Sequence, residues 1–181
     1  MNRIPKETVR GRLLRAAEEL AHENGARNMS LDAVAARAGV SKGGLLYHFP
    51  SKAKLLEALV ESFVEQFEAE LAGRVGTDKG KSGNVGAAVL EMFVQERSYG
   101  RPPPSGVLAA LAENPYLIEP VRKHHADLLE RIRSSVHDKT DATIAYLALQ
   151  GIRSNNLFDF PRLPEKEFEE VVARLREMMG D

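Results

Sequence analysis

The fold follows from one segment, Leu31-Asp32-Ala33-Val34-Ala35-Ala36-Arg37-Ala38-Gly39-Val40-Ser41-Lys42-Gly43-Gly44-Leu45-Leu46-Tyr47-His48-Phe49-Pro50-Ser51-Lys52. Residues 31–38 and 42–48 each carry apolar side chains at helical spacing, and Gly39 lies between them. Two short helices joined by a tight turn that contains glycine predict a helix-turn-helix. A serine precedes each helix expected to begin at 31, 42 or 52, where its hydroxyl can cap free backbone amides: Ser30, Ser41 and Ser51.

The apolar side chains of this segment form one set that can pack beneath a helix expected at residues 7–24. They are Leu31, Val34, Ala35, Ala38, Val40, Leu45 and Leu46. A short helix at the surface buries only one face, so we expect the other side chains of 42–48 to point outward.

Helical periodicity continues through most of the chain. We expect further helices at residues 52–74, 85–99, 105–112, 115–136, 140–158 and 164–179. Strand signals are poor because the sequence has no alternating runs of Val, Ile and Thr. The sequence therefore predicts an all-α fold of about nine helices, with a glycine-rich loop at 73–86 as the clearest boundary.

Composition removes several classes of function. The chain has 181 residues, 43% of them hydrophobic, and no cysteine. Disulfides, thiolate metal sites and cysteine nucleophiles are thereby excluded. No apolar run approaches the length of a membrane span, and the first residues lack a hydrophobic signal segment, so we expect a cytoplasmic protein without a membrane partner.

The charge is divided unevenly along the chain. Residues 1–60 hold 10 Lys and Arg against 6 Asp and Glu, a net charge of +4, whereas residues 61–181 carry −5. A basic N-terminal part favours an anionic partner for that part. The excess is small, so chance remains an alternative explanation for the charge alone.

The second short helix contains residues that helix stability does not explain. Lys42 and Lys52 stand at first helical positions, where a cation opposes the helix dipole. Gly43 and Gly44 each cost about 1 kcal/mol relative to alanine in a helix interior. A bound phosphate would explain the lysines, and a close approach to base edges would explain the glycines. Tyr47 and His48 can donate to phosphate oxygens; alternatively Tyr47 and Phe49 are core aromatics and the lysines are solvated.

The quoted segment resembles the DNA-binding signature of the tetracycline-repressor (TetR) family of bacterial regulators, and the resemblance covers about residues 8–60. It implies a DNA-binding head at 1–51 and a ligand-sensing and dimerisation body at 52–181. By position, Ser41, Lys42, Gly43 and Gly44 would enter the major groove, Tyr47 and His48 would meet the phosphate backbone or adjacent bases, and Lys52 and Ser30 would contact phosphates. The two glycines depart from the expected pattern, since they leave few side chains to read bases.

The C-terminal helices favour a homodimer. The helix at 140–158 is apolar on two faces and the helix at 164–179 carries one apolar stripe, so a two-fold four-helix bundle would cover both. The expected interface residues are Ile144, Leu147, Ala148, Gly151, Ile152, Phe168, Val171, Val172 and Leu175. The alternative is that both helices pack only on their own chain.

The resemblance also implies a cavity for an unidentified small-molecule effector between the helices that span 52–136. Its candidate lining residues are Phe63, Phe67, Leu90, Phe93, Tyr99, Val107, Leu111 and Tyr116; plain core is the alternative for each of them. The pair His124-His125 suggests a metal, but adjacent helical residues point about 100° apart, so we interpret them as surface histidines and expect neither metal nor cofactor.

The function expected from these features is a dimeric repressor that binds a palindromic double-stranded operator and releases it when the effector binds. One alternative is a DNA-binding factor of the same fold without an effector. Another is an all-α enzyme using His124, His125 and Asp127, which no spaced catalytic motif supports, so we do not expect an enzyme.

Overall fold

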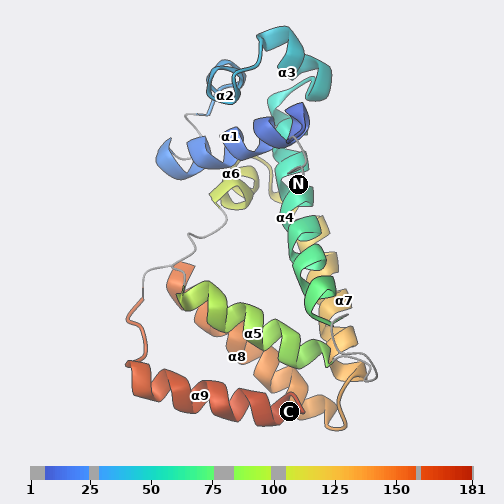
Figure 1. The fold of residues 1–181 in the computed structure, drawn as a ribbon, viewed down its shortest axis with the longest axis vertical. Helices are drawn as coiled ribbons and strands as arrows, with labels where there is room; N and C mark the ends of the chain where they lie inside the picture. The colour runs from blue at the N-terminus through green and yellow to red at the C-terminus, as the bar shows by residue number, and fades with distance from the viewer. Residues whose placement is uncertain (1–6, 25–28, 76–83, 99–104, 158–159, 181) are drawn as a thin grey trace, which may run out of the picture. The chain divides into compact units, whose positions relative to one another are not determined.

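The computed structural model describes residues 7–24, 29–75, 84–98, 105–157 and 160–180 (Figure 1). The regular structure of these residues is helical throughout, which confirms the all-α prediction. The elements are α1 (Val9–Asn24), α2 (Leu31–Ala38), α3 (Lys42–His48), α4 (Lys52–Val75), α5 (Val85–Ser98), α6 (Ser105–Glu113), the 3-10 helix η2 (Pro115–Ile118), α7 (Glu119–Ser134), α8 (Lys139–Leu157) and α9 (Glu165–Met178).

The chain folds into two compact units that share α4. The first unit consists of Met1–Glu65 and Pro104–Val121, and the second of Gln66–Pro103 and Arg122–Asp181. Packing therefore joins α6 to the N-terminal helices, whereas the sequence places the functional boundary between residues 51 and 52. That boundary concerns function and stays a prediction.

The core of the first unit is built from α1 to α4 together with α6. Leu13, Val34, Leu45 and Leu55 are fully buried there, and Ala110 of α6 packs among them. Figure 1 shows α6 beside α1, beneath the helix-turn-helix. The predicted set of packing side chains is correct except for Leu46, which is 37% exposed because it follows Leu45 onto the outer face of α3.

The core of the second unit gathers side chains from the C-terminal part of α4 and from α5, α7, α8 and α9. Its fully or nearly fully buried members include Leu71, Phe93, Leu128, Leu149 and Phe168. One side of α8 is not covered by the rest of the chain, since Ile144 and Leu147 are exposed. Among the described residues, no helix is both long and apolar enough to cross a membrane.

The segment predicted as one helix at 115–136 is divided into η2 and α7. An α-helix would bond the carbonyl of Tyr116 to the amide of residue 120, but Pro120 has no N–H. The amide of Glu119 bonds to the Tyr116 carbonyl instead, which gives the tighter 3-10 turn. The Asn114 side chain caps this turn by accepting a bond of 3.1 Å from the Tyr116 amide.

Candidate nucleic-acid interface

The turn between α2 and α3 is fixed by local hydrogen bonds. Gly39 adopts a left-handed conformation with φ of 64°. Its amide donates to the carbonyl of Ala36 at 3.2 Å, and the amide of Val40 donates to Ala35 at 2.9 Å. This pair of bonds is the Schellman arrangement, which satisfies the last carbonyls of α2 and turns the chain into α3.

The three predicted serine caps are confirmed. Ser30 accepts a bond from the Ala33 amide at 3.1 Å, Ser41 from Gly44 at 3.1 Å, and Ser51 from Lys54 at 3.2 Å: in each helix the hydroxyl oxygen satisfies one first-turn donor. A hydroxyl that accepts such a bond keeps its own hydrogen for donation. Ser30 and Ser41 are both exposed, so each can still donate to an external acceptor.

The two sides of α3 have opposite characters. Leu45 is fully buried and Phe49, which ends the helix, is 3% exposed. Tyr47 between them is 85% exposed, with its ring edge-on to that of His48 at 5.2 Å between ring centres. The sequence alone does not decide whether Tyr47 and Phe49 are core residues. In the structure Phe49 is a core residue, and Tyr47 belongs to the outer face.

The two glycines of α3 stand in different surroundings. A Cβ atom built on Gly43 meets nothing within 4 Å, whereas one built on Gly44 would lie 2.8 Å from Cγ1 of Val40. Gly44 is thus explained by packing within the turn. The fold gives no comparable reason for Gly43, and its bare backbone is part of the exposed surface of α3.

Both predicted DNA-contacting lysines form ion pairs in the first unit. The Nζ atom of Lys42 lies 3.0 Å from the Asp32 carboxylate of α2, and Nζ of Lys52 lies 2.7 Å from Oε1 of Glu113 at the end of α6. Sequence reasoning missed Glu113. A pair of residues 61 positions apart becomes visible only when α6 packs beside the start of α4.

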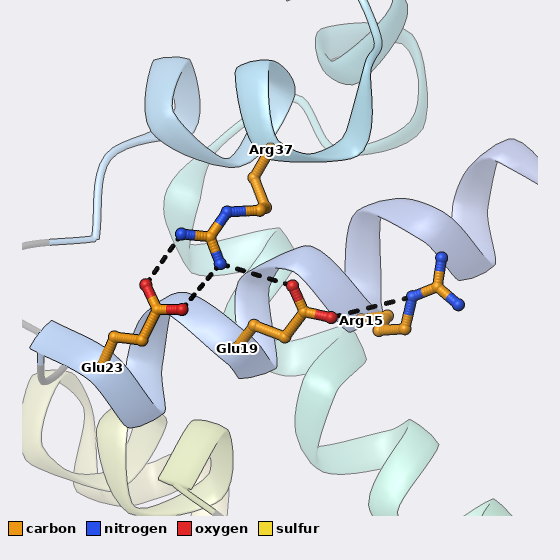
Figure 2. A network of polar contacts seen from close by, with 4 residues as sticks. All are labelled: Arg15, Glu19, Glu23 and Arg37. Atoms are coloured by element: carbon orange, nitrogen blue, oxygen red, sulfur yellow. Dashed lines mark hydrogen bonds and ion pairs between the residues drawn. The ribbon is translucent and has the colours of Figure 1, made fainter.

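A charged network attaches α2 to α1. Figure 2 shows the Arg37 guanidinium donating to both carboxylate oxygens of Glu23, at 2.9 and 2.7 Å, and to Glu19 at 3.4 Å. The bond from Arg37 lowers the pKa of the Glu23 carboxyl, and the bond to Glu23 raises the pKa of Arg37. Such a bidentate pair fixes geometry as well as charge, so it orients α2, and with it the turn into α3.

The second unit contains a polar cluster at the pair His124-His125. Nδ1 of His124 lies 3.0 Å from Glu68 of α4, and Arg131 bonds to the same carboxylate at 2.8 Å. His125 is hydrogen-bonded to the Tyr146 hydroxyl of α8. Burial lowers the pKa of both histidines, and Glu68 partly opposes this effect at His124.

The prediction that His124 and His125 are surface histidines is wrong: His124 is 9% exposed and His125 is half-buried. Their partners lie on other helices, so spacing along α7 alone could not reveal them. Among the described residues, no group of three or more acidic or histidine side chains is arranged to hold a metal ion.

The predicted dimer residues are placed in two ways. Ile144 and Leu147 of α8 are 51% and 61% exposed, and Gly151 is exposed as well. Ala148 and Ile152 are partly buried beside the second core. On α9 the apolar stripe faces its own chain, with Phe168, Val172 and Leu175 buried and Val171 packed against the same core.

The predicted pocket residues are distributed over both units. Three of them lie in or against the first core: Phe63, Val107 and Leu111. Three lie in or against the second core: Phe67, Leu90 and Phe93. Tyr116 is exposed, and Tyr99 lies outside the described residues. An open groove of about 490 Å³ lies elsewhere, between α5 and α9. Val94, Phe168 and Val172 are its apolar lining residues, and Arg162, Glu165, Glu169 and Arg176 its charged ones.

Two family models match the chain. One, described as bacterial regulatory proteins of the tetR family, matches residues 13–59. The other, described as the tetracyclin repressor-like C-terminal domain, matches residues 83–180, which is more than half of the chain. The chain belongs to the tetR family.

Individual relatives agree with this assignment. The transcriptional activator FasR of Mycolicibacterium smegmatis is 32% identical over 121 residues, which cover 66% of this chain and 52% of FasR. The chain thus spans about half the length of this curated relative. Two solved structures share the fold: a transcriptional regulator from Rhodococcus (TM-score 0.65, 21% identity, 96% and 95% of the two chains covered) and the SmeT–triclosan complex (TM-score 0.66, 20% identity, 94% and 89% covered).

Proposed function

We propose that this tetR-family chain is a transcriptional regulator that inserts α3 into the major groove of a palindromic operator. The observation that carries the proposal is the division of α3: Leu45 and Phe49 anchor it in the first core, while Lys42, Gly43 and Tyr47 are presented outward. An α-helix fits the major groove, and its exposed side chains then reach base edges and phosphates. In this arrangement Ser30, Ser41, His48 and Lys52 contact the backbone or the groove edge.

We further propose that the protein acts as a homodimer through α8. Two copies of α3 are needed to read both halves of a palindrome. Ile144 and Leu147 form an apolar strip that the chain itself leaves uncovered, and the small residues Gly151, which is exposed, and Ala148, which is partly buried, continue it. Because the stripe of α9 is used in the core of its own chain, α8 would supply most of the apolar contact.

Release by a small molecule is the mode of control that we propose for the second unit. The name of one structural neighbour describes a complex with triclosan, and the FasR name describes an activator, so the family resemblance supports both a ligand and either sign of control. A factor without an effector is the second candidate. The buried, closed surroundings of Leu90 and Phe93 favour it, since these residues are already enclosed by neighbouring side chains.

In-vitro selection of bound duplexes from a random pool tests the first proposal. We expect an enriched palindrome, with binding to it that weakens steeply as salt rises, because phosphate contacts release counterions. Lys42→Gln should lower the salt dependence by about one unit of slope. Lys166→Gln on α9 removes an equal charge far along the sequence and should leave the slope unchanged. Failure to enrich any duplex would refute DNA recognition by α3.

A further inference from the structure

Lys52 and Glu113 each stand at the electrostatically unfavourable end of their own helix. Lys52 is the first residue of α4, where the helix dipole is positive, and Glu113 is the last residue of α6, where it is negative. The two side chains meet at 2.7 Å, and their exposed fractions are 30% and 37%. The pair therefore offsets two unfavourable placements at once, in a site that is partly screened from water.

The position of the pair is set by packing rather than by the pair itself. Leu55, one turn into α4, and Ala110, one turn before the end of α6, are both fully buried in the first core. Lys52 and Glu113 thus extend from two helix ends that the core holds beside each other. The two helix ends therefore stay beside each other whether or not the ion pair is formed.

We propose that Glu113 is an internal competitor of DNA phosphate for Lys52 and so sets the affinity of the DNA interface. This inference rests on the proposed function. A carboxylate and a phosphate oxygen are alternative anionic acceptors for the same ammonium. In the unbound protein Lys52 donates to Glu113. On DNA, Lys52 must leave that partner to reach a phosphate, and the carboxylate is left beside the negatively charged backbone.

Asp32 makes a useful comparison with Glu113. It pairs with Lys42 at 3.0 Å, but both of these side chains are more than 60% exposed. Exposed pairs contribute little and exchange readily with solvent ions. The Lys52–Glu113 pair is less exposed, at 30% and 37%, so competition by Glu113 should be stronger than competition by Asp32.

The test is a titration of the whole 181-residue chain against its selected operator at several salt concentrations. Glu113→Gln keeps the shape of the side chain and removes its charge, so we expect about two- to fivefold tighter binding at low salt. The gain should shrink as salt rises, because salt already screens the pair. Glu113→Asp keeps the charge and should bind within about twofold of the original protein.

Two further variants separate this mechanism from general electrostatics and from damage to the fold. Glu57→Gln removes a carboxylate that pairs with Lys54 on α4, and it should change affinity less than Glu113→Gln does. In a Lys52→Gln background, Glu113→Gln should give no gain. An equal gain with and without Lys52, or an unchanged or weaker affinity in Glu113→Gln, would overturn the proposal. If the original protein binds no duplex in a salt-dependent way, the proposed function itself fails and this inference falls with it.

Discussion

Replacing Gly43 and Gly44 by alanine, one at a time, should separate the demands of the fold from those of DNA. At Gly43 the added methyl group meets nothing within 4 Å, so the variant should gain up to about 1 kcal/mol in the free energy of unfolding from the better helix propensity of alanine. At Gly44 the methyl group would lie 2.8 Å from Val40 Cγ1, well inside normal carbon contact.

Relief of that overlap determines the effect at Gly44. Val40 is β-branched, has few rotamers and packs against the first core, so it cannot move away freely. Overpacking of this kind costs about 1–3 kcal/mol, which the propensity gain of about 1 kcal/mol offsets only in part. We therefore expect Gly44→Ala to be less stable than Gly43→Ala by about 1–3 kcal/mol in a urea titration.

Binding should follow the opposite order. If the bare backbone at Gly43 lies against the groove, a methyl group there holds α3 away from the base edges, and Gly43→Ala should bind the operator at least about tenfold more weakly although it is the more stable protein. Fluorescence anisotropy with the selected duplex measures this. A Gly43→Ala protein with unchanged operator affinity would refute the close approach, and equal stability of the two variants would refute the packing argument.

The remaining predictions concern the core, the dimer and pH. Leu45→Ala should lower the free energy of unfolding by about 2–5 kcal/mol, whereas Leu46→Ala should lower it by less than about 1.5 kcal/mol. Denaturant titration measures both values. Similar losses in the two variants would contradict the assignment of the two faces of α3. Leu147→Arg should produce monomers in sedimentation experiments while Ala126→Arg on the exposed side of α7 should not, and a dimer that survives Leu147→Arg would exclude α8 as its contact. Burial lowers the pKa of His124 in the folded protein below its ordinary value of 6.5. As pH falls through about 6.5, this histidine is therefore protonated in the unfolded chain while it is still neutral in the folded one. The proton stabilises the unfolded chain, so the free energy of unfolding should fall from pH 7.5 toward pH 5.5. His124→Asn should flatten this decline and His137→Asn at the surface should not; an undiminished decline in His124→Asn would show that the buried histidine is not its source.

Local signals in the sequence predict the helix-turn-helix well. The bounds of α2 and α3 match the expected ranges because the caps at Ser30 and Ser41 and the left-handed Gly39 are all made within a few residues. The all-α class follows from periodicity in the same way. Both features depend on residues close together in the sequence, so no distant contact is needed to predict them.

Features that depend on a distant partner could not be predicted. The burial of His124 is compensated by Glu68, 56 positions earlier, and Lys52 is paired with a residue on α6. The apolar stripe of α9 predicts that another surface covers it, but a stripe does not say whether its own chain or a second copy supplies that cover. The division between η2 and α7, by contrast, can be predicted from the sequence, because Pro120 has no amide hydrogen to donate.

The separation of α3 into a buried face and an exposed face has an evolutionary consequence. Within residues 42–49, Gly44, Leu45 and Phe49 pack against the interior, so substitutions at the exposed positions 42, 43, 46 and 47 should change the stability of the fold less than substitutions at those three. If α3 reads DNA as proposed, a duplicated copy of such a gene can acquire new target sequences by a few substitutions on this exposed face, at little cost to the stability of the fold.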